Sequence, residues 1–152
     1  MISVLLRSLE QIMLKISRLA DYSMVLMHGL SQPDSNLYSA TQLADQSSIP
    51  LPTVSKVLKL LSDAGLVTAT RGVQGGYRLA RTPSTTSVAD VIAAIDGDLA
   101  LTECSETLDQ CALSGSCQLR SNWQYISKQV QQMLSQISIA DMQQPIELES
   151  KV

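Results

Sequence analysis

Two short helices followed at once by a glycine-rich hairpin, within residues 39–79, constrain the fold of this chain most strongly. Ser39 can begin the first helix, and Gln42 three residues later completes the pattern of a capping box. The stretch SIPLP interrupts this helix, and TVSKVLKLLSDAG then starts a second helix that Gly65 is placed to end. Two short helices joined by a tight turn predict a helix-turn-helix. The apolar stripe of the second helix consists of Val54, Val57, Leu58 and Leu61.

The hairpin predicted after the second helix has the form of a wing. Val67, Thr68 and Thr70 favour one strand, RGVQGG favours a turn, and Tyr77 and Leu79 favour a returning strand. Helix pairs and hairpins are each common, but their adjacency in this order predicts a winged helix-turn-helix.

Three further helices are expected around this unit, which makes the predicted fold mainly α. One covers residues 14–30 with Ser17 as its cap, and another starts near residues 84–87 and ends by Gly97. The third covers residues 119–142, and its heptad-like seam predicts a long C-terminal dimerisation helix. The alternative is that this helix folds back on its own head. The seam consists of Leu119, Trp123, Ile126, Val130, Met133 and Ile137.

The chain divides into four expected segments. No apolar run approaches the roughly 18–20 residues that span a bilayer, and the opening MISVLLRSLEQI lacks the cleavage site of a signal peptide. We therefore expect a cytoplasmic protein with no membrane partner. The segments are an N-terminal extension (1–12), a winged helix-turn-helix head (13–82), a helix with cysteine loop and dimerisation helix (83–142), and a flexible tail (143–152).

Charge is distributed unevenly along the chain, although the net charge is only −3. Residues 1–81 contain eight Lys or Arg against five Asp or Glu, whereas residues 82–152 contain three against nine. A polyanion such as DNA would dock on the basic half, because binding depends on local potential. An enzyme is not expected, since the sole histidine, His28, lacks a paired nucleophile and GVQGG is not a P-loop.

Residues outside the apolar stripe of the second helix are candidates for contact with double-stranded DNA. The helix would enter the major groove with its N-terminal residues against base edges. Hydroxyls serve bases or phosphates and lysines serve phosphates, while a wing arginine suits a narrow minor groove. The same residues would also be ordinary on a solvated surface. The candidates are Thr53, Ser55, Lys56 and Lys59 in the helix, and Arg71, Gln74 and Gly75 in the wing.

All three cysteines of the chain lie in one loop, ECSETLDQCALSGSCQL, as Cys104, Cys111 and Cys117. In a cytoplasmic protein such a group more often indicates metal or redox chemistry than a disulfide framework. An iron–sulfur cluster, a structural zinc and a free-thiol redox sensor all remain open on the residues alone. A tetrahedral metal would also need a fourth ligand.

Several stretches together resemble the winged-helix iron–sulfur transcriptional regulators typified by IscR and the nitric-oxide sensor NsrR. Between Leu14 and about Met142 these are LKISRLADYS, LADQSSIPLPTVSKVLKLLSDAGLV, RGVQGGYRLAR, SVADVIAAIDG and the three-cysteine loop. ISRLADY, LPTVSKVLKLL and LTEC look most like the branch that regulates the SUF operon for iron–sulfur cluster assembly. The resemblance implies a homodimeric repressor that binds a palindromic operator and senses cluster, redox or nitric-oxide status.

The resemblance also implies the ligands of the cluster. In the family the three loop cysteines hold it close to the dimer interface. IscR-type members add a histidine where this chain has Arg120, which stays protonated and cannot ligate. NsrR-type members add an aspartate from the partner's first helix, and Asp21, followed by Tyr22, is similar. We favour Asp21 as the fourth ligand and [4Fe–4S] over [2Fe–2S], although Asp21 would also suit its helix dipole without ligation.

Two other functions stay open at this point. One is the same DNA-binding fold with a zinc site or a thiol redox switch in the cysteine loop. The other is a winged-helix protein-interaction module that does not bind DNA.

Overall fold

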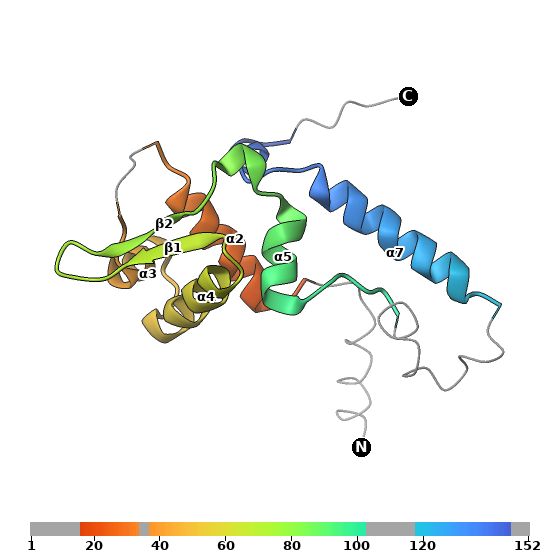
Figure 1. Ribbon diagram of the computed structural model, residues 1–152, viewed down its shortest axis with the longest axis horizontal. Coiled ribbons are helices and arrows are strands. Elements are labelled where there is room, and N and C mark those ends of the chain that lie inside the picture. The colour runs from red at the N-terminus through yellow and green to blue at the C-terminus, as the bar shows by residue number, and fades with distance from the viewer. Residues whose placement is uncertain (1–15, 34–36, 103–117, 147–152) are drawn as a thin grey trace, which may run out of the picture.

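A winged head with one long helix standing apart from it forms the described part of the chain (Figure 1). The computed structural model describes residues 16–33, 37–102 and 118–146. Helices α2 to α5 and the β1–β2 hairpin form the head, and α7 lies beyond α5. The predicted fold, mainly α with a winged helix-turn-helix, is confirmed. The elements are α2 (Arg18–Leu30), α3 (Ala40–Ser47), α4 (Leu51–Asp63), β1 (Val67–Thr70), β2 (Gly76–Leu79), η1 (Pro83–Thr85), α5 (Val88–Asp96), α7 (Arg120–Ser135) and η2 (Asp141–Gln143).

Serine caps begin three of the helices. Ser17 Oγ accepts the backbone N–H three residues further on, at 3.0 Å. The predicted capping box of α3 is present: Ser39 Oγ accepts the Gln42 N–H at 3.1 Å, and Ser39 N–H donates to Gln42 Oε1 at 2.8 Å. Ser87 caps α5 in the same way, with Asp90 as its reciprocal partner. Each cap satisfies N–H groups that a first helical turn leaves free, so local sequence fixes these helix starts.

The second helix of the helix-turn-helix, α4, begins at Leu51, slightly before the predicted start at Thr53. Pro52 stands in its first turn, where a missing N–H costs no helical hydrogen bond. Gly65 follows the helix with a φ of 71°, in the left-handed region where glycine is unstrained. The predicted apolar stripe is completely buried and consists of Val54, Val57, Leu58 and Leu61.

Aliphatic side chains fill the core of the head, as a chain without Phe requires. Leu26 and Met27 of α2, Leu43 of α3 and Val91 of α5 all pack in one cluster with the α4 stripe. Helix α4 contacts α2, α3, α5 and β1, so it is the element on which the others converge.

The wing is an antiparallel pair in which Val67 lies opposite Leu79. A third backbone segment joins it: Tyr38 N–H donates to the Tyr77 carbonyl at 3.0 Å, and Tyr77 N–H donates to the Tyr38 carbonyl at 2.8 Å. A Cβ on Gly76 would lie 2.8 Å from the Tyr38 carbonyl oxygen, so the close approach of these backbones requires glycine. The base of the wing is therefore attached to the segment before α3.

Helix α7 leaves the head and makes its main contact with α5. It ends at Ser135, so the predicted continuation to Met142 is wrong. The helix stops because the residues after it pair with the head instead. Ser127 is the one side chain of α7 that is buried. No helix in the described ranges has the length and apolar character needed to cross a membrane.

Residues 137–143, which we call the C-terminal latch, fold back onto the head. The Ile137 carbonyl accepts the Val88 N–H at 2.8 Å, and the Ile139 N–H donates to the Thr86 carbonyl at 2.8 Å. The Ile139 side chain is 1% exposed and belongs to the core of the head. The head therefore contains a core residue from beyond the cysteine loop and α7.

Polar contacts hold the far end of the latch. Gln143 Nε2 donates to the Ser31 carbonyl at 3.1 Å and to Ser31 Oγ at 2.8 Å, at the end of α2. An Asp141 carboxylate oxygen accepts from Ser138 Oγ at 2.6 Å and from the Ser138 N–H at 2.8 Å. These hydrogen bonds hold the pKa of Asp141 below its ordinary value of 3.8. The far end of the latch is thus tied to the end of α2.

We expect Ile139→Ala to destabilise the head, because it removes a buried aliphatic side chain from the core. The unfolding free energy should fall by about 2–5 kcal/mol, and by about 0.5–1.5 kcal/mol in Ile139→Val. Urea unfolding at one fixed protein concentration measures both. Met142→Ala, at a position that is 44% exposed, is the control and should leave the midpoint nearly unchanged. An Ile139→Ala chain as stable as this control would contradict a role of the latch in the core.

Candidate functional site

The outward side of α4 carries the four helical residues predicted to contact DNA. Ser55, Lys56 and Lys59 are exposed and Thr53 is half-buried. Their spacings of three and four residues place them on neighbouring turns of one helical surface. The opposite side of α4 is buried in the core, so this surface is held facing away from the head.

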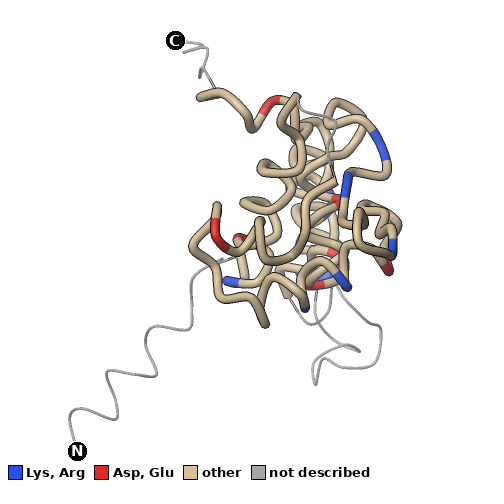
Figure 2. Tube along the Cα trace, turned by 90° about the vertical axis from the view of Figure 1, so that its left-hand side faces the viewer, with Lys and Arg blue, Asp and Glu red and all other residues tan. Residues whose placement is uncertain are grey.

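The two lysines of α4 differ in their surroundings. Lys59 Nζ lies 3.0 Å from Asp63 Oδ2 in an exposed ion pair, whereas Lys56 forms no ion pair with any described residue. Lys and Arg positions are spread over several parts of the head rather than gathered in one patch (Figure 2). The charge distribution therefore does not mark a DNA-binding surface here, and contact of α4 with DNA stays a prediction that rests on its place in the helix-turn-helix.

The wing exposes Arg71 and Gln74 at its turn, while Gly75 is half-buried. A Cβ on Gly75 would lie 2.1 Å from the Thr70 carbonyl oxygen, so the hairpin itself requires glycine there. Contact of Gly75 with DNA stays a prediction. Val73, which is not among the predicted contacts, is completely exposed at the tip of the wing. The signal that could have found it is an apolar residue in the middle of a polar turn.

The three cysteines at 104, 111 and 117 lie outside the described residues. Within the described ranges, no group of three His, Cys, Asp or Glu side chains is arranged to hold a metal ion. Asp21 is exposed in the first turn of α2, and Arg120 is the first residue of α7. The described part of the chain therefore shows the position of the candidate fourth ligand but not its partners.

Residues 97–102, which we call the loop root, lead from α5 into the cysteine loop. They lie where α5, α7 and the start of α2 come together. Leu101 N–H donates to Ser127 Oγ of α7 at 3.2 Å. Ser17 Oγ, which caps α2, donates to Asp96 Oδ1 at the end of α5 at 2.7 Å. The first bond joins the loop root to α7, and the second joins the end of α5 to the start of α2. Asp21 belongs to the first turn of α2.

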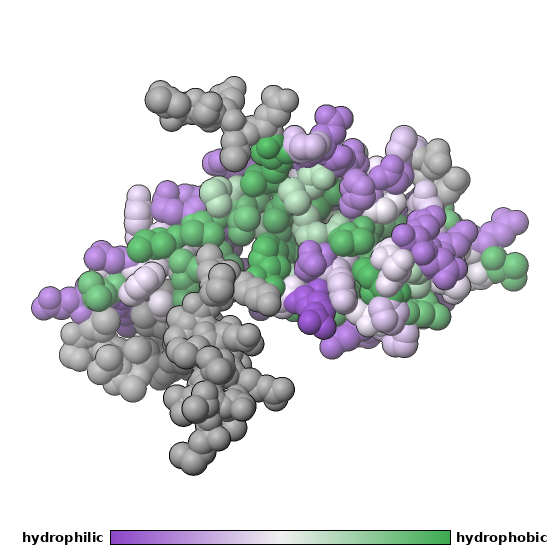
Figure 3. Space-filling view, turned by 180° about the vertical axis from the view of Figure 1, so that it is seen from behind, coloured by the Kyte–Doolittle hydropathy of each residue, from purple (hydrophilic) through white to green (hydrophobic). Residues whose placement is uncertain are grey.

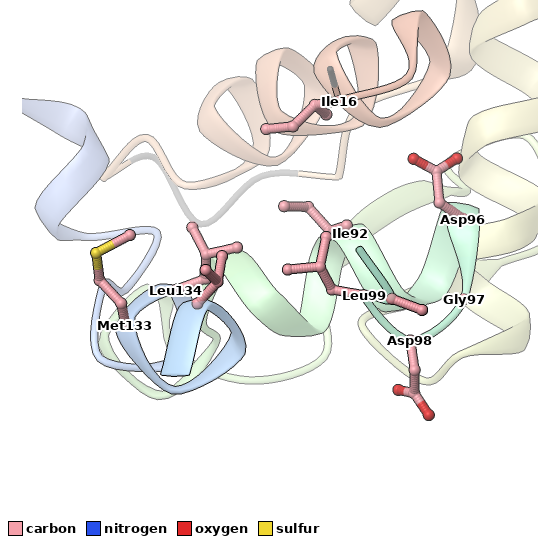
Figure 4. Close-up of a pocket in the computed structure, with 10 residues that line it drawn as sticks. Ile16, Ile92, Asp96, Gly97, Asp98, Leu99, Met133 and Leu134 are labelled. Atoms are coloured by element: carbon pink, nitrogen blue, oxygen red, sulfur yellow. The ribbon is translucent and has the colours of Figure 1, made fainter. Parts of the chain in front are cut away.

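An apolar hollow of about 460 Å³ lies at the same junction. Ile92 of α5, Leu99 of the loop root and Leu134 of α7 surround it, with Ile16 on the opposite side, whereas Asp98 points away (Figure 4). Hydrophobic side chains thus lie on one side of the loop root, and polar side chains of α7, among them Ser127 and Lys128, lie on another.

Helix α7 exposes much of its predicted apolar seam. Trp123 is 39% exposed, Ile126 is 41% exposed and Met133 is 56% exposed. Hydrophobic side chains accordingly lie on the outside of the molecule along this helix (Figure 3). Large exposed apolar side chains in one row are typical of a surface that another protein covers.

Comparison with known proteins places this geometry in a family. Residues 16–145 match the family described as Rrf2, Iron-dependent Transcriptional regulator. Protein rrf2 of Nitratidesulfovibrio vulgaris is 30% identical over 118 residues, which cover 78% of this chain and 76% of that protein. These matches are to transcriptional regulators and not to enzymes, as expected from the sequence.

Two solved structures share the fold. CymR (YrzC), the global cysteine regulator of B. subtilis, has a TM-score of 0.68 and 25% identity, over 86% of this chain and 97% of that one. IscR of T. potens has a TM-score of 0.65 and 29% identity, over 85% of each chain. With a winged head, an outward-facing α4 and a family match over most of its length, the chain belongs to the Rrf2 family of DNA-binding transcriptional regulators.

Proposed function

We propose that this chain is a homodimeric repressor whose binding to a palindromic operator depends on an iron–sulfur cluster in the cysteine loop. The place of the loop carries the proposal, because the loop root follows α5 directly and is hydrogen-bonded to α7, while α5 is hydrogen-bonded to the start of α2. A change in the loop would act on α2, which packs against α4. The similarity to T. potens IscR and the iron-dependent family description support it. The target genes, by resemblance, are those of iron–sulfur cluster assembly.

The chemistry of the available donors fits such a cluster. Three thiolates, from Cys104, Cys111 and Cys117, are the soft ligands that iron–sulfur clusters prefer. Asp21 is exposed and can supply a carboxylate to the partner subunit, whereas Arg120 cannot ligate. We assign [4Fe–4S] rather than [2Fe–2S] by resemblance. When bound, the cluster supplies an iron that a hard carboxylate holds weakly, and that iron is open to loss, oxidation or nitric oxide.

In the proposed mechanism, the residues between the cysteine loop and α4 transmit a change in the loop to the outward side of α4. Ser17 and Asp96 fix the first turn of α2 against α5, and α2 in turn packs against α4. A shift at this junction would alter the relative placement of the two heads of the dimer. A coupling free energy of about 1–3 kcal/mol is enough for a useful change in operator affinity.

We expect anaerobically purified protein to contain iron and to absorb visible light, and Cys104→Ala, Cys111→Ala and Cys117→Ala each to lose most of both. Asp21→Ala should retain the cluster less well than the wild type, because one ligand is gone. Asp45→Ala, which removes an exposed carboxylate from α3, is the matched control. Gel shifts on the same samples connect cluster content to DNA affinity. A colourless, iron-free wild type whose DNA affinity ignores the cysteine substitutions would contradict the proposal.

The same metal analysis also tests a second candidate function, a DNA-binding regulator with a zinc site or a thiol switch in the cysteine loop. The arginine in place of a histidine ligand favours the thiol form of this alternative, because a thiol switch needs no fourth ligand. Zinc in place of iron, or metal-free protein that responds to thiol oxidants, would establish it.

The exposed seam of α7 should form the dimer interface. Ile126→Glu places a charge in this apolar row and should make the protein monomeric at concentrations where the wild type is dimeric. Gln132→Glu adds the same charge at an exposed polar position of α7 and should remain dimeric. Sedimentation equilibrium measures both. Equal dimerisation of the two variants would show that this row is not the interface.

Lys56 should contribute more to DNA binding than Lys59, because Lys59 is paired with Asp63. In a dimer, Lys56→Gln removes two phosphate contacts, which lowers the salt slope by about two and affinity roughly thirtyfold at 0.15 M salt. Lys59→Gln should cost less than about threefold. Thr53, Ser55, Arg71, Gln74 and Gly75 are the other proposed contacts. Fluorescence anisotropy with a duplex selected from random DNA measures these effects, and equal losses for the two lysines would contradict the assignment.

A further inference from the structure

A second hollow, of about 430 Å³, lies between the first turns of α2 and α4. Arg18 and Tyr22 line it from α2, and Thr53 and Lys56 line it from α4. Leu19 and Pro50 complete its wall. No pattern in the sequence placed Arg18 and Tyr22 beside α4, because only tertiary packing brings the two helix starts together.

Positive charge and hydroxyl groups converge in this hollow. Arg18 and Lys56 line it together, and among the described residues no carboxylate does. Neither forms an ion pair in the described part of the chain, where the one such pair joins Lys59 to Asp63. Two like charges held at one hollow repel each other, and an anion placed between them removes that repulsion. The Tyr22 and Thr53 hydroxyls can donate hydrogen bonds to the oxygens of the same anion.

The position of the hollow specifies which anion it would take. It opens beside the N-terminal turn of α4, the part of a recognition helix that lies closest to base edges in the major groove. Backbone phosphates border that groove, and arginine, lysine, tyrosine and threonine are among the side chains that contact them. We propose that this hollow binds a backbone phosphate of DNA, with Arg18 and Lys56 supplying charge and Tyr22 and Thr53 supplying hydroxyl donors. The assignment rests on the proposed function as a DNA-binding regulator.

The proposed phosphate site includes Arg18 from the first turn of α2, the same turn that Ser17 joins to α5 and that carries Asp21. Arg18 follows Ser17, whose hydroxyl is bonded to Asp96, and Asp21 stands three residues further on. A displacement of this turn by the cysteine loop therefore moves a phosphate contact directly. Helix α2 thus takes part in DNA binding in addition to supporting α4.

Arg18→Gln tests the assignment with the cluster-loaded dimer. It removes two phosphate contacts per dimer, so affinity should fall roughly thirtyfold at 0.15 M salt and the salt slope by about two. The loss should be similar for the selected operator and for an unrelated duplex, because phosphates carry no sequence information. Tyr22→Phe, which removes only the hydroxyl, should lose roughly tenfold. Lys128→Gln on α7 is the matched loss of one charge and should change neither quantity by more than about twofold.

Circular dichroism and thermal unfolding establish that each variant is folded. An Arg18→Gln salt slope equal to that of Lys128→Gln would overturn the assignment, as would a loss confined to the operator. Inorganic phosphate, added to DNA-free protein at constant ionic strength, measures binding of the free anion through the melting temperature. A rise that Arg18→Gln abolishes, with a duplex affinity that the same substitution leaves unchanged, would assign the hollow to free phosphate and overturn the DNA assignment. A wild type that binds no duplex would overturn the proposed function itself, whereas wild-type binding unaffected by Arg18→Gln would overturn only this site.

Discussion

The burial of one side of α4 against α2, α3, α5 and β1 determines the rest of the head. The four stripe residues of this helix are completely excluded from solvent, so α4 cannot rotate without exposing aliphatic surface. Its polar side is therefore presented in one orientation. Because the chain has no Phe, this fixed orientation comes from many small aliphatic contacts rather than from a few large aromatic ones.

The residues with proposed functions meet at the first turn of α2 rather than at α4. Ser17 joins that turn to α5, Asp21 stands on it as the proposed cluster ligand, and Arg18 faces the recognition helix. A single turn that touches both regions can couple them through rigid movement, without a long chain of intermediate contacts. The acidic character of the second half of the chain does not oppose DNA binding in this arrangement, because the groups that would face DNA come from the first half.

Local signals in the sequence were sufficient for much of the fold, since caps at Ser17 and Ser39, the α4 stripe and the wing depend on residues close to one another in the chain. Contacts between distant residues were not predictable in this way. The bond of Gln143 to Ser31 spans 112 residues, and no pattern of neighbours indicates it. The sequence predicts too late an end for α7 for the same reason. The apolar spacing continues through Ile137, but in the structure the backbone of Ile137 and Ile139 pairs with the head instead of continuing the helix. The Lys59–Asp63 pair, four residues apart, could have been recognised from spacing alone.

The burial of Ile139 makes the head discontinuous in sequence, with the cysteine loop and α7 inserted between its last two core-forming parts. A ribosome synthesises the N-terminal part of a chain first, so most of the head emerges from the ribosome before Ile139 has been added. The core can close only after the cysteine loop has been synthesised. A protein built in this order does not complete its winged head before its cysteine loop exists, because the latch that supplies Ile139 follows that loop in the chain.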